Sequence, residues 1–393
     1  MGRKMMLLSV IASMDPKNGG PAEALRNLVK EFNKRGHTHH ILTGDGPDAN
    51  YADKDSPNFI HQGPSLATFG YAPNMDKWLV EHICDYDAVL IHGLWQFNGL
   101  TVWKRAREVR QPYWILPHGM LDPYFNRQSR LKHLKKLVYW PIQYRILRDA
   151  VAVLFTSEEE RVLARQSFKR YKVREEVISY AAGQPPRDVS DSRSAFISKF
   201  PELQNQRYIL FLGRVHPKKG CDLLVKAFAR TAAHEQLVLV FAGPADGRYF
   251  ESLKTLIEEE GVSHRVVWTG MLLGLEKYGA LKGADVFALL SHQENFGIAV
   301  AESLSCGTPV LITRPVNIWR EIEHDGAGIV GDDTVEGSIQ LVQQWLSLSE
   351  QDKLVMGRNA RECYARRFTV EQSVTSLLTK FAAVIDVETS PAG

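Results

Sequence analysis

The sequence has little cysteine, little net charge and no long hydrophobic run. Its 393 residues include four cysteines, which lie far apart and form no CxxC pair: Cys84, Cys221, Cys306 and Cys363. This spacing argues against a disulfide framework and a structural zinc site, and it favours a reducing, cytoplasmic environment. A formal net charge of +3 argues against a nucleic-acid-binding surface over the whole protein. No apolar run approaches the ~20 residues of a membrane-spanning helix.

The N-terminal residues 1–13 combine two basic residues with a short apolar stretch, which is also a feature of signal peptides. The stretch is brief and leads directly into a glycine loop and a helical pattern, residues 14–28. We therefore interpret residues 4–11 as a buried strand rather than as part of a signal peptide.

Short apolar runs alternate with helical periodicity along the whole chain. Strands are expected at 4–11, 38–44, 88–93, 113–119, 152–157, 207–215, 237–243, 266–270, 286–291, 308–314 and 326–331. Such alternation predicts an α/β fold with mostly parallel sheets, and the length predicts two domains. We expect two doubly wound, Rossmann-like domains facing across a cleft. A polar, Pro- and Ser-rich stretch separates them, which gives domains at 1–183 and 206–371 and a linker at 184–205.

A cationic loop follows the expected strand at 207–215. Arg214 and Lys219 lie in this loop, and Gly220 precedes a helical pattern. Two cations beside a helix N-terminus favour binding of a diphosphate, because charge attraction and free backbone N–H groups converge there. The alternative is a solvated basic loop.

Gly19 and Gly20 lie between the first strand and the first helix, before Pro21. Glycine lets the backbone approach an anion or a sugar closely. The segment is not a GxGxxG fingerprint, so an ordinary turn is the alternative.

Two glutamates bracket a glycine turn in "QENFGIAVAESLSCGTPV", residues 293–310. Glu302, about one turn into the helix that follows Gly297, is placed to bind a diol such as a ribose. Glu294, in the loop, is free to reach a second polyhydroxyl group, since carboxylates bind vicinal hydroxyls well. The alternative is a solvated Glu302 and a Glu294 that caps the turn.

These motifs, in this order, resemble the retaining GT-B glycosyltransferases of family four. The resemblance rests on Gly19-Gly20, "RGHTHHILTG", "PHG" at 117–119, "GRVHPKKG", the Glu294–Glu302 pair with "CGTPV", "EIEHDGAGIV" and "RRFTVEQSVTSLLTKFAAVI". It spans nearly the whole chain. One departure is "VISYAAGQPP", residues 177–186, where relatives often carry an Asn-Gly-Ile-Asp turn, so the hinge geometry stays open.

The resemblance implies a role for each matching residue. Arg214 and Lys219 would bind the donor diphosphate, Glu302 the ribose, and Glu294 the transferred sugar. His118 would lie by the 6-hydroxyl of that sugar and by the reacting centre. The other implied donor contacts are Gly19, Gly20, Met271, Asn295, Phe296, Gly297 and Ile298.

The histidines are interpreted separately, because 13 occur in the chain. His118 follows a strand end in "WILPHGM" and is predicted to be catalytic together with Glu294, Arg214 and Lys219. His92 in "LIHGLW" is a weaker candidate, and the others are interpreted as surface or packing residues.

The resemblance also implies a retaining mechanism without a metal or a cofactor. The departing diphosphate would take the acceptor's proton, so no base carboxylate is needed. A closing helix at about 372–390 would pack back on the first domain.

Residues 127–148 concentrate basic and aromatic side chains, and Pro141 is expected to split them into two helices. A basic amphipathic helix suits peripheral contact with an anionic membrane, such as the inner face of the plasma membrane. The alternative is a solvated helix whose Leu and aromatic side packs inward.

The expected activity is transfer of a hexose, with UDP-glucose as the favoured donor, to a glycan or lipid-linked glycan in polysaccharide biosynthesis. ADP-glucose, GDP-mannose and UDP-galactose stay open as donors, and the sequence does not define the acceptor, the linkage or the oligomeric state. The alternatives are an epimerase or phosphorylase of the same architecture and a non-catalytic nucleotide-sugar-binding protein.

Overall fold

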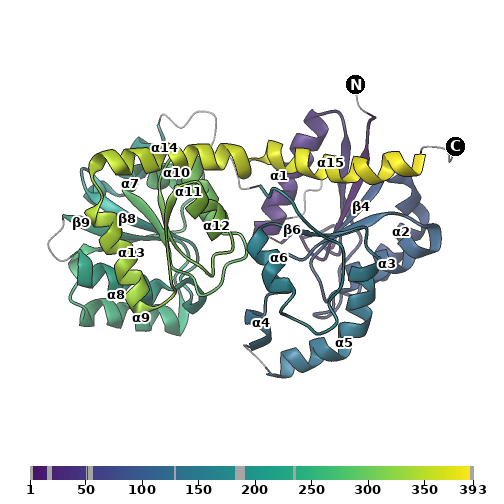
Figure 1. Cartoon of the computed structure of the whole chain (residues 1–393), viewed down its shortest axis with the longest axis horizontal. Coiled ribbons are helices and arrows are strands. Elements are labelled where there is room, and N and C mark those ends of the chain that lie inside the picture. Colours follow the sequence, from purple (N-terminus) through teal and green to yellow (C-terminus); the bar gives the residue numbers. More distant parts are fainter. Residues whose placement is uncertain are drawn as a thin grey trace. The chain divides into compact units, whose positions relative to one another are not determined.

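The structure, a computed structural model, describes residues 3–15, 20–49, 51, 56–127, 130–181, 191–232 and 236–389. The chain divides into two compact units. Unit 1 is Met1–Ala181 with Val370–Gly393, and unit 2 is Ala182–Thr369. In Figure 1 each unit is a twisted sheet with helices packed on its faces.

Unit 1 is built on a parallel sheet in the order β3-β2-β1-β4-β5-β6-β7. Its strands are β1 (Met6–Ile11), β2 (Thr38–Thr43), β3 (Phe59–His61), β4 (Ala88–His92), β5 (Tyr113–Leu116), β6 (Val153–Phe155) and β7 (Glu175–Val177). Its helices are α1 (Gly20–Lys34), α2 (Pro73–His82), the 3₁₀ turn η2 (Ile83–Asp85), α3 (Phe97–Val109), α4 (Tyr124–Arg127), α5 (Arg130–Asp149), α6 (Glu158–Ala164) and α15 (Val370–Thr389). The chain order reverses between β1 and β4.

Helix α1 shows how the local sequence produces this packing. Leu25, Leu28 and Phe32 recur at helical spacing and are buried. Gly36 ends the helix in a left-handed conformation, with φ +82°. His37 N–H then donates to the Phe32 carbonyl oxygen at 3.1 Å, as in a typical glycine C-cap.

The C-terminal helix α15 packs within unit 1 against α1. Phe381 is buried, and its ring lies 4.7 Å from that of Trp114 on β5. Arg35, just after α1, donates to Thr375 Oγ1 at 2.8 Å. The last helix therefore completes the core of unit 1.

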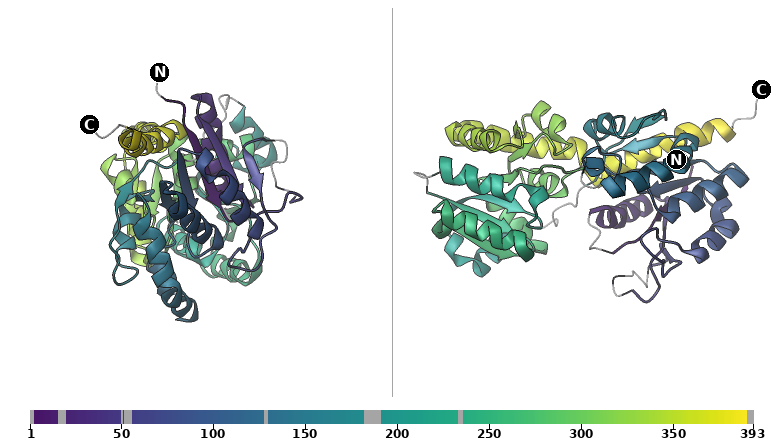
Figure 2. Two further views of the ribbon diagram at one scale, coloured as in Figure 1. Left: turned by 90° about the vertical axis from the view of Figure 1, so that its right-hand side faces the viewer. Right: turned by 90° about the horizontal axis from the view of Figure 1, so that it is seen from below.

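The predicted break at Pro141 is wrong, because α5 runs unbroken from Arg130 to Asp149 with Pro141 inside it. Proline removes one backbone hydrogen bond, but tertiary packing holds the helix. Trp140 stacks on Phe168 at 4.3 Å, and Ile146 and Leu147 are buried. Figure 2 shows α5 as a long helix at one side of unit 1.

Unit 2 is built on a second parallel sheet in the order β10-β9-β8-β11-β12-β13. Its strands are β8 (Arg207–Leu212), β9 (Leu237–Ala242), β10 (Val266–Gly270), β11 (Val286–Leu289), β12 (Val310–Thr313) and β13 (Gly328–Gly331). Its helices are α7 (Ser192–Lys199), α8 (Cys221–Thr231), α9 (Gly247–Glu259), α10 (Gly274–Gly283), α11 (Ile298–Ser305), α12 (Trp319–His324), α13 (Val335–Ser347) and α14 (Glu350–Arg367). Short 3₁₀ turns are η3 (Pro201–Leu203), η4 (Pro217–Lys219) and η5 (Ser263–Arg265).

The predicted linker, 184–205, differs from the structure in its second half. Residues 182–190 lie outside the described part of the chain. Helix α7 lies inside unit 2 and packs against α10, with Phe196 fully buried. The polar composition of the stretch hid its two fully buried apolar residues, Phe196 and Leu203.

Candidate functional site

The predicted cationic and acidic loops of unit 2 follow two neighbouring strands. β8 ends at Leu212, before Arg214 and Lys219. β11 ends at Leu289, before Glu294. The two strands pair directly, and the chain order of the sheet reverses between them. In open parallel sheets, ligands bind outside the carboxyl ends of the strands at such a reversal, so both loops occupy the expected position.

Backbone contacts hold these two loops together. His292 N–H donates to the carbonyl oxygen of Lys218 at 2.9 Å. Gly220 has φ +62°, and a Cβ atom there would lie 1.9 Å from the carbonyl oxygen of Leu290. Only glycine allows this approach. The loop that carries Lys219 therefore lies directly against the loop that carries Glu294.

Lys219 and Glu294 form an ion pair. Their side chains are 25% and 18% exposed, so solvent reaches the pair. Arg214 is exposed and makes no ion pair or hydrogen bond with the described residues. Burial is the main cause that lowers the pKa of the nearby His216, followed by the positive charge of Arg214. An anion at this loop would meet Arg214, which has no partner among the described residues, and Lys219, which can exchange Glu294 for the anion.

Glu302 lies on α11 and is buried, with 6% of its surface exposed. Its Oε1 accepts a hydrogen bond from Lys277 Nζ on α10 at 2.6 Å. Gly297 precedes α11 with φ +77°, so the left-handed backbone that starts this helix requires glycine. A diol at Glu302 would share the carboxylate with Lys277.

The other predicted donor contacts follow the carboxyl ends of β10 and β11. Met271 is 59% exposed, and Asn295 and Ile298 are partly buried. Phe296 is buried, with its ring 5.5 Å from that of Phe368. Its side chain belongs to the core of unit 2. These ligand contacts stay predictions.

In unit 1, the chain order also reverses, between β1 and β4. Gly20 begins α1 after β1, whereas Gly19 lies outside the described residues. His92 ends β4 and His118 follows β5. Nδ1 of His92 lies 3.0 Å from Nε2 of His118, and their rings stack at 5.2 Å. The weaker candidate therefore contacts the stronger one.

A buried carboxylate fixes the turn at His118. Gly119 N–H donates to Glu160 Oε1 at 2.6 Å, and the Thr156 hydroxyl donates to Glu160 Oε2 at 2.7 Å. His118 has φ +52°, which is uncommon for a non-glycine residue and often marks functional positions. Burial lowers its pKa to about 4, so the ring is neutral at pH 7.

Four further polar residues of the two units were missed by the sequence analysis. Lys277 gave no signal, because its partner Glu302 lies 25 residues away. Asn317 donates its backbone N–H to the Glu294 carbonyl oxygen at 3.0 Å. Ser9 and His39 are hydrogen-bonded to each other and fully buried. A polar residue inside an otherwise apolar strand was the available signal for this last pair.

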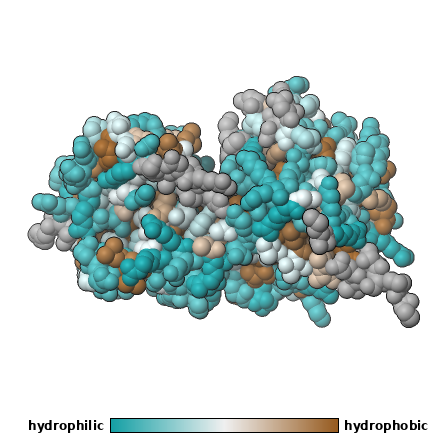
Figure 3. Space-filling model, turned by 90° about the horizontal axis from the view of Figure 1, so that it is seen from above, coloured by the Kyte–Doolittle hydropathy of each residue, from teal (hydrophilic) through white to brown (hydrophobic). Residues whose placement is uncertain are grey.

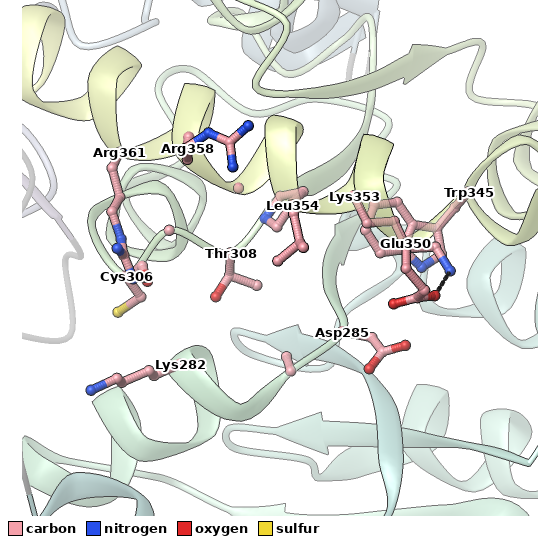
Figure 4. A pocket seen from close by; sticks show the side chains of 14 residues that line it. Lys282, Asp285, Cys306, Thr308, Trp345, Glu350, Lys353, Leu354, Arg358 and Arg361 are labelled. Carbon is pink, nitrogen blue, oxygen red and sulfur yellow. Dashed lines mark hydrogen bonds and ion pairs between the residues drawn. The ribbon is translucent and has the colours of Figure 1, made fainter. Parts of the chain in front are cut away.

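A cavity of about 400 Å³ in unit 2 lies at the opposite edge of the sheet. Its walls include Asp285, just before β11, and Pro309, just before β12. Lys282, Arg358 and Arg361 also line it (Figure 4). None of the predicted site residues line this cavity.

Among the described residues, no group of three or more His, Cys, Asp or Glu side chains is arranged to hold a metal ion. Metal-independent activity stays a prediction. Within the same ranges, no helix combines the length and apolar character needed to cross a membrane.

Two family models together cover most of the chain. The glycosyl transferase 4-like domain matches residues 19–181, and glycosyl transferases group 1 matches residues 192–363. Among curated proteins, the alpha-monoglucosyldiacylglycerol synthase of Streptococcus pneumoniae is 27% identical over 75% of this chain and 68% of its own length. The N-acetyl-alpha-D-glucosaminyl L-malate synthase of Bacillus anthracis is 27% identical over 97% of this chain and 98% of its own.

Solved structures share the fold over nearly the whole chain. Sucrose-phosphate synthase from Thermosynechococcus elongatus has a TM-score of 0.76 at 18% identity, covering 98% of this chain and all of its own. Anabaena Alr3699/HepE in complex with UDP and glucose has a TM-score of 0.73 at 19% identity, covering 97% of this chain and 100% of its own. The chain therefore belongs to the group 1 glycosyl transferases, and its two Rossmann-like units form a GT-B fold.

Proposed function

We propose that this glycosyltransferase moves glucose from UDP-glucose to a glycan or lipid-linked glycan in polysaccharide biosynthesis, with retention of configuration and without a metal. The observation that carries the proposal is the Lys219–Glu294 ion pair beside the free Arg214, at the reversal point of the unit 2 sheet. The relatives support the choice of sugar and base, since one is a monoglucosyldiacylglycerol synthase and another was solved with UDP-glucose.

In the proposed complex, Arg214 and Lys219 bind the diphosphate and stabilise the charge that develops as it departs. Lys219 then exchanges its Glu294 partner for phosphate, which frees the Glu294 carboxylate for hydroxyls of the transferred sugar. Glu302 binds the ribose. The acceptor's proton goes to the departing phosphate, so no base carboxylate is required.

Three other functions are alternatives for the same site. A nucleotide-sugar epimerase would convert the donor without an acceptor, and a phosphorylase would require inorganic phosphate. A non-catalytic binding protein would bind the donor without turnover. Analysis of the products separates all three from transfer.

The test measures nucleoside diphosphate release from UDP-, ADP- and GDP-sugars in the presence of EDTA, with and without glycan acceptors. For Glu294→Gln we expect turnover about 100-fold lower, because the carboxylate no longer holds the sugar in the transition state. Lys226→Ala removes one positive charge from α8 outside the site and serves as the control. Turnover that is equal in wild type and Glu294→Gln would contradict the site assignment.

We also propose that the protein is cytoplasmic and binds peripherally to anionic membrane through α5. The exposed apolar residues of this helix recur every three or four positions: Leu131 (75%), Leu134 (58%), Leu137 (45%), Val138 (76%) and Ile142 (38%). At 100° per residue, the exposed Lys135 and Arg145 lie beside the same stripe. Such a combination suits a helix lying in a lipid interface.

The packing of α5 agrees only in part with the alternative of a helix whose Leu and aromatic side packs inward. The aromatic side packs inward, as Trp140 does on Phe168, but the leucine stripe faces solvent. The structure does not describe the side chains of residues 126–130 and 132, so the proposed membrane contact does not rest on Arg127, Arg130 or Lys132. The face drawn in Figure 3, by contrast, is mostly hydrophilic, with small separate hydrophobic areas.

Sedimentation with vesicles tests this contact. Wild type should bind vesicles of phosphatidylcholine with phosphatidylglycerol. Leu134→Glu with Val138→Glu should weaken this binding about tenfold or more, because two charges replace the exposed apolar groups that would enter the lipid interface. Val80→Glu, at an exposed site on α2, is the control. Equal losses in the double variant and the control would contradict docking through α5.

A further inference from the structure

A chain of hydrogen bonds crosses the unit 1 sheet and ends at His118. His39 Nε2 lies 2.8 Å from Ser9 Oγ, Ser9 Oγ lies 3.1 Å from His92 Nε2, and His92 Nδ1 lies 3.0 Å from His118 Nε2. These residues come from β2, β1, β4 and the loop after β5, which are neighbours in that order in the sheet. Ser9, His39 and His92 are almost completely buried.

All three rings are neutral at pH 7. Burial lowers the pKa of His39 to about 3 and that of His118 to about 4, and it lowers the pKa of His92 well below its ordinary value. A neutral imidazole carries one N–H and one lone pair. Each ring therefore carries a proton on one nitrogen and a lone pair on the other.

The buried end of this hydrogen-bond chain determines the direction in which its protons point. His39 Nδ1 is buried and has no hydrogen-bond partner among the described residues, and Ser9 has only the two histidines as side-chain partners there. If the protons ran from His118 towards His39, Nδ1 of His39 would be a buried N–H without an acceptor. Unpaired buried N–H groups are the rarer defect in proteins. The favoured direction leaves a lone pair at that position.

In this direction, His39 donates to Ser9, Ser9 donates to His92 Nε2, and His92 Nδ1–H donates to His118 Nε2. The remaining proton of His118 is then on Nδ1. This nitrogen has no hydrogen-bond partner among the described residues, and His118 is only partly buried, so the N–H is available to a ligand. The bond from Gly119 N–H to Glu160 Oε1 fixes the left-handed backbone at His118, φ +52°.

We propose that Ser9, His39 and His92 are positioning residues that hold His118 as its Nδ1–H tautomer, so that His118 donates a hydrogen bond to a hydroxyl oxygen of the transferred sugar. The sugar contact rests on the proposed function, whereas the tautomer does not. Free histidine favours the Nε2–H tautomer, so the proposal predicts the opposite of the default.

The experiment uses full-length protein with ¹⁵N-labelled histidine, and long-range ¹H–¹⁵N spectra at pH 7. His118→Gln identifies the His118 signals. Wild type should show a protonated Nδ1 and an unprotonated Nε2 at His118. In His92→Phe, which keeps a stacked ring but removes the donor, His118 should revert to Nε2–H.

Kinetics separate the proposal from the proposed function. His92→Phe should lower turnover about tenfold, as for one lost hydrogen bond, without changing the affinity for UDP. Absence of transfer in wild type would end the proposed function but leave the tautomer to be decided by the spectra. An Nε2–H tautomer in wild type, with the His39 proton directed at the neighbouring Phe32 ring, would overturn the proposal, as would an unchanged tautomer in His92→Phe.

Discussion

The carboxyl edges of the two sheets use different chemistry at equivalent topological positions. In unit 2 the edge carries charged pairs, Lys219 with Glu294 and Lys277 with Glu302, which are partly open to solvent. In unit 1 the edge carries neutral, buried rings, with His92 bonded to His118.

This difference matches two tasks. Charged pairs at an accessible edge can exchange partners when an anion arrives, because the anion replaces one interaction of similar strength with another. A neutral chain cannot exchange partners in this way, because its groups are fixed by burial, and it instead determines which atom carries a proton. Under the proposed function, unit 2 would bind the charged leaving group and unit 1 would orient the neutral sugar.

The contact between the two loops of unit 2 gives the largest expected effect on stability. Gly220→Ala places Cβ against the Leu290 carbonyl oxygen and should destabilise unit 2 by about 3 kcal/mol, through steric overlap and an unfavourable φ. Gly261→Ala is the matched control, since Gly261 has φ +72° with open space around it, and should cost about 1 kcal/mol. Urea unfolding measures both, and equal losses would show that the loops are not in close contact.

The neutral histidines of the hydrogen-bond chain in unit 1 should make the stability of the protein depend on pH. The pKa of His39 is lowered to about 3 in the folded state, so below pH 6.5 the unfolded chain binds a proton that the folded chain does not. Stability is therefore retained at pH 7 and falls towards acid.

Replacing His39 removes this difference. Between pH 7 and pH 5, His39→Leu should lose about 2 kcal/mol less stability than wild type. His264→Leu, at an exposed site in η5, is the control and should lose as much stability as wild type. Denaturant unfolding at both pH values measures the difference, and identical losses for His39→Leu and wild type would mean that His39 is not held neutral.

The sequence predicted the charged edge better than the neutral one. Arg214, Lys219 and Glu294 are conspicuous, because they lie in loops that follow apolar strands. The α/β alternation predicted every strand of the two sheets except the short β3 and β7. The family and the GT-B fold inferred from these motifs are confirmed by the family models and the solved relatives.

The features that the sequence did not predict depend on contacts between distant parts of the chain. Ser9 and His92 are 83 residues apart, so only the sheet order β2-β1-β4-β5 shows that they meet. Pro141 was misinterpreted because local backbone chemistry argues for a break, whereas packing of Trp140 and its neighbours maintains the helix. Helix α7 was hidden for a similar reason, since its place in unit 2 depends on the burial of Phe196 against α10.

The most direct test of the donor site is a calorimetric titration of UDP into wild type, Lys219→Ala and Lys226→Ala, with EDTA present. We expect Lys219→Ala to bind UDP about 10- to 100-fold more weakly than wild type, as for one lost charge-assisted hydrogen bond, and Lys226→Ala to match wild type. Equal affinity in all three proteins would contradict the assignment of the diphosphate to this loop.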